Sequence, residues 1–493
     1  MNDLPFRRQI SVGILAAASF LGLGGTVARA AVATSTEPTQ EELSSMIPVE
    51  MRPDRRAVPD EDNAALPLKT AMRRAAVPSP DVKEALAVLS AWGKTLSVSP
   101  DTNTPLVRSW QHENAEALRI FRSAAKQSQC LFPSPSTTNV AEGLNVLVPL
   151  ARGLLIEARL LWRDGSRTEA ITELRNAVVI SGHLIRGART LLHYLVASSV
   201  RRQALEAIHT AALSPDCSEA DLRQLAAVLS QPPDDATRLR ECIRSELSDY
   251  IVPTTRLEII QANFAGIQTN TAALLFYPEE LHRPLTLIFD PKLLASHPQP
   301  LDALKSMRGS VDHWTAVDRR LAMPWSTNTL PDDIEATRER FVGDFAPIEE
   351  ELDGEDLPLS DEAVTRAAPL FQKMENPVGR LLASLPDFNE RTHQRTVEAE
   401  TRFRALATVI ALRRWALDHG GALPDSLQVL VDAGQLPALP LDAFSGQPLH
   451  YSSRRELVWS VGPNARDDDG KRDAGFEGID DDPSWSVTPG SRP

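Results

Sequence analysis

Apolar residues recur every three or four positions through much of residues 81–229, and this spacing limits the possible folds more than any other feature of the chain. Such a period places the apolar side chains on one face of an α-helix. It predicts helices over residues 81–96, 140–162, 167–180, 191–212 and 219–229. Ser218, followed by Asp221, supports the start of the last helix, and Pro149 is expected to kink or split the second.

The composition favours packed helices over sheets. Aromatic residues make up 5% of the 493 residues and hydrophobic residues 42%, which is enough for a buried core that is poor in strands. The formal net charge of −14 weighs against a nucleic-acid partner, because few cations are left to neutralise phosphates. We therefore expect a mainly α fold: a helical body over residues 81–340, then an acidic linker and connecting helix over residues 341–387.

Two of the predicted helices carry small residues where they would meet. Ala158, Ala170 and Ala177 would let the helices approach closely, and Gly165 lies in the turn between them. These positions resemble the packing pattern of a tetratricopeptide repeat. No second copy follows at a fixed period, so a plain helical hairpin is the alternative.

The N-terminal residues 1–33 have the features of a signal peptide. A pair of arginines precedes an apolar run over residues 10–23, and Ala-x-Ala patterns follow within residues 28–33. The chain is therefore expected to be exported to the periplasm or cell envelope. An uncleaved segment that anchors the chain to the membrane is the alternative. Residues 34–80, rich in Pro, Glu and Thr, are expected to form a flexible tether.

The last part of the chain, residues 388–493, predicts a small α/β module. A long helix over residues 388–419 ends at a Gly-Gly pair. An Asp-x-Phe-x-Gly turn follows at residues 442–446. Residues 449–451 and 456–461 then form the strands of a β-hairpin, in which Leu457, Trp459 and Val461 alternate onto one face.

The order of these elements resembles the C-terminal head domain of the major pseudopilin of type II secretion systems. The similar part runs from Arg402 to Trp485 and includes a Val-Gly-Pro-Asn sequence at residues 461–464, before an acidic loop. The resemblance implies a head outside the cytoplasm with a structural calcium ion in that loop. The sequence has no Gly-Phe-Thr-Leu-Ile-Glu prepilin site, which argues against a true pilus subunit.

The acidic loop supplies candidate ligands for calcium, a cation that binds several carboxylate and carbonyl oxygens at once. The candidates are Asp467, Asp469, Asp473, Asp480 and Asp481. Glycines between them would let the backbone wrap an ion, although the spacing is not that of an EF-hand. A solvated acidic tail without a metal is the alternative.

Three shorter segments resemble stretches of large uncharacterised bacterial exported proteins. They are Pro-Asp-Glu-Asp-Asn-Ala-Ala at residues 59–65, Cys-Leu-Phe-Pro at residues 130–133 and Asn-Pro-Val-Gly-Arg at residues 376–380. The first segment is expected to open the ordered body. That family offers no activity to transfer to this chain.

Scattered histidines and arginines give no metal or catalytic spacing. His183 and His193 lie near the predicted bundle and are expected to be packed or surface residues. Arg201 and Arg238 belong to small basic helix faces, which we expect to be paired with neighbouring glutamates.

No catalytic motif accompanies these features. The sequence lacks a P-loop, a dinucleotide fingerprint, a Gly-x-Ser-x-Gly elbow and a His-Glu-x-x-His pair. Cys130, Cys217 and Cys242 are expected to be buried free thiols. We predict an exported non-enzymatic protein that binds protein partners or serves as a structural component. The alternatives are an accessory component of a secretion or pilus-like assembly and a hydrolase without a recognisable motif.

Overall fold

The computed structural model describes residues 38–54, 56–92, 103–133, 143–230, 233–252, 282–288, 290–325, 343, 345–357, 359–384, 388–471 and 482–488. These residues are mainly helical, and a small three-stranded antiparallel sheet lies near the C-terminus. The predicted fold class is confirmed. The predicted signal peptide, residues 1–33, lies outside the described residues.

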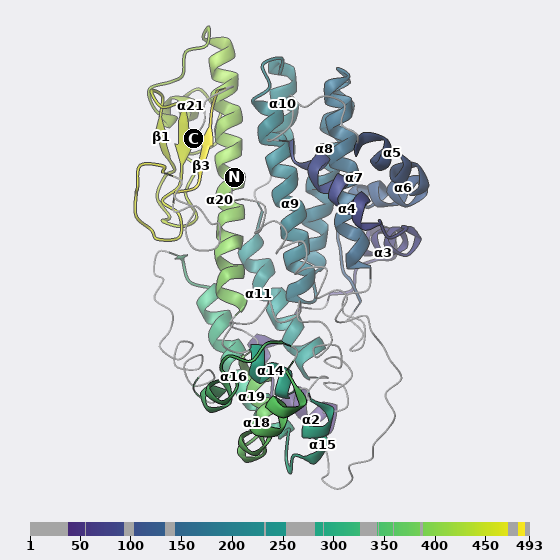
Figure 1. Cartoon of the computed structure of the whole chain (residues 1–493). Helices are drawn as coiled ribbons and strands as arrows, with labels where there is room; N and C mark the ends of the chain where they lie inside the picture. The colour runs from purple at the N-terminus through teal and green to yellow at the C-terminus, as the bar shows by residue number, and fades with distance from the viewer. Residues whose placement is uncertain are drawn as a thin grey trace.

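Long helices that stand side by side form the centre of the molecule (Figure 1). They are α7 (Leu144–Arg163), α8 (Arg167–Gly187) and α9 (Leu191–Ala212), which follow one another along the chain. Gly165, in the turn between α7 and α8, has a φ of +83°, a left-handed conformation that favours glycine. Ala158, Ala170 and Ala177 are buried in one apolar cluster, as their small size predicts. A repeat-like character of this pair stays a prediction.

Pro149 does not split α7, which continues through it. Pro149 is the sixth residue of the helix, so its missing N–H leaves a single carbonyl, that of Asn145, without its usual helical donor near the helix start. The start of α10 (Glu219–Val228) is as predicted: Ser218 and Asp221 form a capping box. The sequence also placed α9 correctly at both ends.

Short helices cover one side of the long ones. They are α3 (Ala65–Arg74), α4 (Pro80–Ser90), α5 (Asn103–Glu113) and α6 (Ala115–Ser123), whereas α2 (Gln40–Ser45) lies at the lower end of the molecule (Figure 1). The predicted tether over residues 34–80 is therefore wrong for the part that the structure describes. Leu43, Met51 and Leu68 are buried in the main core, although they are too widely spaced in the sequence to form a local pattern. Packing against distant helices, and not local periodicity, orders this segment.

A second group of helices forms the lower end of the molecule in Figure 1. It consists of α14 (His282–Ile288), α15 (Pro291–Ser296), α16 (Ala303–Leu321), α18 (Asp361–Lys373) and α19 (Pro377–Ser384). Phe345, Ile348 and Leu352 are buried in the apolar cluster of this group. The acidic segment within residues 341–387 thus carries a buried apolar face, which corrects its prediction as a solvated linker.

The C-terminal module contains α20 (Phe388–Asp418), α21 (Leu427–Asp432), β1 (His450–Ser452), β2 (Leu457–Trp459) and β3 (Ser484–Ser486). β2 is central and pairs antiparallel with β1 and β3. The hairpin was predicted, but β3 was not. Val458 enters the module core, while Leu457 and Trp459 share the opposite face, which Gly470 of the acidic loop covers.

α20 belongs to two cores at once. Phe403, Leu406 and Ile410 lie in an apolar cluster with residues of α8, α9 and α10. Another set of α20 residues lies in the module core with residues of α21, β2 and β3; these are Ala405, Val409, Ala411 and Leu412. The same helix therefore completes the body and supports the sheet.

Candidate functional site in the C-terminal module

Trp325, just after α16, joins the lower helices to the module. Its ring packs edge-on against Phe444 and His393, with centroids 5.5 and 5.1 Å away. Its Nε1 donates to the carbonyl oxygen of Pro463 at 3.0 Å. The Val-Gly-Pro-Asn sequence is thus a contact between module and body.

A second contact involves β3 and α9. His209 Nε2 donates to the carbonyl oxygen of Ser486 at 3.1 Å. Nearby, Arg413 Nε of α20 donates to the carbonyl oxygen of Ala212 at 3.3 Å. The module is therefore held to the body by polar contacts as well as by the shared helix.

Asp442, in the Asp-x-Phe-x-Gly turn, is fully buried and satisfied. Its Oδ1 accepts hydrogen bonds from the N–H of Phe444 at 3.0 Å and from Ser460 Oγ at 2.9 Å. Its Oδ2 accepts from the N–H of Val461 at 3.1 Å. Because Thr401 Oγ1 of α20 also donates to it, at 3.4 Å, this carboxylate connects the turn, the end of β2 and α20.

Asp482, in contrast, is fully buried but only half satisfied. Its Oδ2 accepts from the N–H groups of Asp468 and Gly470, both at 2.8 Å. Among the described residues, its Oδ1 has no hydrogen-bond partner. Burial raises the pKa of this carboxyl; the two N–H groups oppose the rise, and the charges of Asp467 and Asp468 add to it. An acceptor of this kind, left without a partner, is costly unless a ligand satisfies it.

The predicted calcium ligands are only partly described. Asp473, Asp480 and Asp481 lie outside the described residues. Asp467 is already engaged: its Oδ1 accepts from Trp459 Nε1 and from the N–H of Asp469, both at 3.0 Å. Its Oδ2 lies 3.3 Å from His450 Nδ1. Asp469 adopts a left-handed φ of +62° in an exposed turn.

Within the described ranges there is no group of three or more His, Cys, Asp or Glu residues that could hold a metal ion. The better candidate oxygen is Oδ1 of Asp482, which the sequence analysis missed. No local signal in the sequence distinguishes Asp482 from its acidic neighbours. The burial that singles it out depends on β3, which was not predicted.

The Pro-Asp-Glu-Asp-Asn-Ala-Ala segment and the Cys-Leu-Phe-Pro segment contact each other. Asn63 Nδ2 donates to the carbonyl oxygen of Leu131 at 3.1 Å, and its Oδ1 accepts from the N–H of Leu131 at 2.9 Å. A Cβ on Gly187 would lie 2.7 Å from Cys130 Sγ, so only glycine fits there. Arg189 Nε donates to the carbonyl oxygen of Phe132 at 3.1 Å. Both segments are therefore structural.

The third segment joins α16 to α19. Asn376, with a φ of +53°, accepts the N–H of Asp302 at 2.7 Å and donates to Ser306 Oγ at 3.1 Å. A Cβ on Gly379 would lie 1.9 Å from Ser306 Oγ. The Asn-Pro-Val-Gly-Arg sequence thus permits a close contact between helices.

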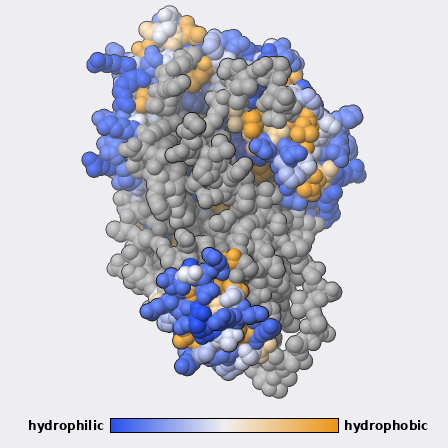
Figure 2. Space-filling model, viewed as in Figure 1, coloured by the Kyte–Doolittle hydropathy of each residue, from blue (hydrophilic) through white to orange (hydrophobic). Residues whose placement is uncertain are grey.

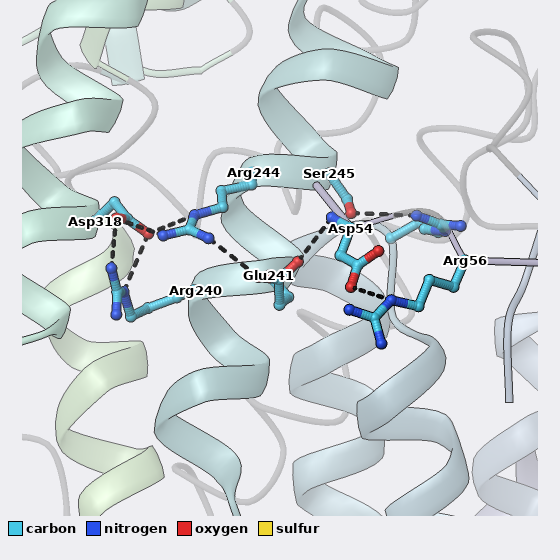
Figure 3. A network of polar contacts seen from close by, with 8 residues as sticks. Asp54, Arg56, Arg240, Glu241, Arg244, Ser245 and Asp318 are labelled. Atoms are coloured by element: carbon cyan, nitrogen blue, oxygen red, sulfur yellow. Dashed lines mark hydrogen bonds and ion pairs between the residues drawn. The ribbon is translucent and has the colours of Figure 1, made fainter. Parts of the chain in front are cut away.

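An ion-pair network holds the N-terminal segment to α11 (Asp235–Glu246) and α16 (Figure 3). Asp318 accepts from Arg240 Nη2 at 2.8 Å and from Arg244 Nε at 3.0 Å. Arg244 also contacts Glu241, which accepts the N–H of Asp54 at 3.3 Å. Although burial raises the pKa of Asp318, the two arginines hold it below its usual value. We interpret the network as structural.

The cysteines are buried free thiols, as predicted. Burial raises the pKa of Cys130 and of Cys217 to about 12, so neither is a reactive thiolate at neutral pH. Burial lowers the pKa of His193 to about 4, and the ring is neutral.

No family model, curated protein or solved structure matches the chain. In the described part of the chain, no helix is long and apolar enough to cross a membrane.

Proposed function

We propose that this chain is an exported, non-enzymatic protein whose helical body carries the C-terminal module as a rigid end piece that binds a protein partner. The observation that carries the proposal is the double use of α20, which places side chains in the body cluster and in the module core. A module fixed in this way presents its outer surface in one orientation, and rigid elements position binding residues better than loops do.

The module has exposed apolar residues with which a partner could make contact. Leu417, at the end of α20, and Leu441, before the Asp442 turn, are each 45% exposed. In the view of Figure 2, hydrophobic residues on the upper part of the molecule form small groups among hydrophilic ones. Such a surface suits a reversible protein contact of modest size.

The test is affinity capture with the full chain as bait in cell-envelope extract, followed by identification of the partner and a binding assay with that pure partner. We expect Leu417→Asp or Leu441→Asp to weaken binding at least tenfold. The matched control is Leu304→Asp, because Leu304 is similarly exposed, at 49%, but lies on α16. Equal binding by all three variants would contradict the proposal, as would repeated failure to capture a specific partner.

The same variants separate this role from one in a secretion assembly. Deleting residues 402–493 would also remove Phe403, Leu406 and Ile410 from the body cluster, so a loss of secretion could not be assigned to the module. The point variants leave that cluster intact. Reduced protein secretion with Leu417→Asp and not with Leu304→Asp would favour the assembly role.

We further propose that calcium braces the acidic loop of the module. Support comes from Asp482, whose buried Oδ1 lacks a partner, while its Oδ2 is held by the N–H groups of Asp468 and Gly470. This oxygen suits a hard cation, since carboxylate oxygens are the ligands that calcium prefers. A bound ion would neutralise the crowded charge of Asp467, Asp468 and Asp482 and would fix the loop against β2.

A further inference from the structure

Two arginines from different helices lie beside Gly182 on α8, and a third lies near enough to act on one of them. Nη2 of Arg201, from α9, and Nη1 of Arg186, from α8, lie 3.2 and 3.8 Å from the point where a Cβ on Gly182 would stand. Arg238, from α11, is close enough for its charge to act on Arg186. The missing side chain at position 182 therefore leaves room for a guanidinium group from each of two helices.

The carboxylates near this cluster do not balance its charge. Arg201 donates through Nη1 to both oxygens of Asp235, and the two side chains are buried together. Arg238 pairs with Asp234 across 3.9 Å, in a pair whose side chains are 39% and 60% exposed. An exposed pair with this separation contributes little.

Arg186 itself pairs with a neutral group. Within the described chain its hydrogen-bond partner is His183, whose Nδ1 lies 2.8 Å from Nη2 of Arg186. Because a guanidinium only donates, the ring nitrogen must accept. Burial and the charge of Arg186 lower the pKa of His183 to about 4, so the ring carries no charge at neutral pH. Arg186 is thus held in place without being neutralised.

The like charges act on one another. Burial lowers the pKa of Arg186, and Arg201 and Arg238 lower it further, against the opposing effect of Cys130 and Asp235. Even so, Arg186 is exposed to solvent. An incoming anion can therefore reach the guanidinium of Arg186, which its positively charged neighbours Arg201 and Arg238 repel.

We propose that Arg186, Arg201 and Arg238 form a binding site for a phosphate-type oxyanion beside Gly182. Guanidinium groups bind tetrahedral oxyanions through paired N–H donors, and several donors from different helices suit an ion with several acceptor oxygens. A phosphate group carries nearly two negative charges at neutral pH, which matches this excess better than a single carboxylate does. Free phosphate and a phosphate monoester share this chemistry.

The test is calorimetric titration of the full chain with inorganic phosphate at fixed ionic strength. We expect saturable binding that weakens at least tenfold in Arg186→Gln and in Arg238→Gln. The matched control is Arg175→Gln, because Arg175 is an exposed arginine on the same helix. A parallel titration with phosphoserine distinguishes the sources: tighter binding of the monoester indicates a phosphorylated partner, and tighter binding of the free ion indicates inorganic phosphate.

A folding defect must be separated from a binding defect. Without phosphate, Arg186→Gln should melt at the same temperature as the unmodified chain or higher, because the substitution relieves repulsion between like charges. Absence of saturable phosphate binding to the unmodified chain would overturn the proposal. So would equal affinity in the Arg186→Gln, Arg238→Gln and Arg175→Gln variants.

Discussion

The two faces of α20 differ in how they make their contacts. The face toward the body places large side chains, Phe403, Leu406 and Ile410, among helices. The face toward the module uses smaller ones, including Ala405 and Val409, where the helix packs against α21 and the sheet. A helix that is apolar on opposite sides is buried on both. Body and module are therefore not separate units joined by a linker, and we expect them to unfold together.

Substitutions that leave a cavity on either face of α20 should lower the stability of the chain most. Phe403→Ala, on the body face, should lower the unfolding free energy by about 3–5 kcal/mol, and Leu412→Ala, on the module face, by about 2–5 kcal/mol. Each substitution should shift the same transition in urea, followed by both circular dichroism and tryptophan fluorescence. If Leu412→Ala shifted the fluorescence of the module while the helical signal kept its midpoint, the two faces would belong to independent units.

Loss of the Asp442 carboxylate should be nearly as damaging. Asp442→Ala leaves the N–H groups of Phe444 and Val461 and the hydroxyl of Ser460 without their acceptor, at an expected cost of about 3 kcal/mol. Chemical denaturation would measure the cost. Ser445→Ala is the control, since it removes a single 3.3 Å contact to Asp442. If Asp442→Ala lowered the stability of the module alone, body and module would not unfold together.

Calcium should stabilise the whole chain through the module. At a hundredfold excess over its dissociation constant, an ion bound only to the folded state adds about 2.7 kcal/mol. The unmodified chain should therefore melt higher in calcium than in chelator, and magnesium should substitute poorly.

Asp482→Asn should abolish the calcium effect, whereas Asp418→Asn, at the exposed end of α20, should keep it. Identical melting curves of the unmodified chain in calcium and in chelator would leave the loop as a plain acidic segment.

The pH dependence should be smaller and should arise in the body. Burial raises the pKa of Glu246 to about 7, against the opposing hydrogen bond from the N–H of Leu191. Because the folded state holds a proton that the unfolded state releases above about pH 4.5, stability from this group falls as the pH rises from about 4.5 to about 7.

Glu246 remains partly exposed, so we expect a change of about 1–2 kcal/mol between pH 5 and pH 8. Glu246→Gln should reduce this slope when unfolding is measured at both pH values. The outcome that contradicts the assignment is an unchanged slope.

Local patterns predicted the helices well and the long-range contacts poorly. The spacing in residues 191–212 and the capping box at Ser218 sufficed, because both act within one helix. Leu43 and Met51 were assigned to a tether because their partners lie far along the chain. β3 was not predicted for the same reason. Its Ser486 pairs with Leu457 of β2, which lies on the other side of the acidic loop in the sequence.

The candidate site shows the same limit. The sequence indicated an acidic loop, but which carboxylate lacks a partner depends on the fold. Asp467 was an obvious candidate and is engaged by Trp459. Asp482 was not among the predicted ligands, and within the described residues its Oδ1 has no hydrogen-bond partner. No spacing rule in the sequence separates these two residues.

Scanning calorimetry of the full chain tests most directly whether α20 makes the body and the module one cooperative unit. We predict a single transition whose calorimetric enthalpy equals its van't Hoff enthalpy, as two-state unfolding requires. Phe403→Ala and Leu412→Ala should move that one transition without splitting it. Two resolved transitions in the unmodified chain, one of which moves alone with Leu412→Ala, would contradict the account.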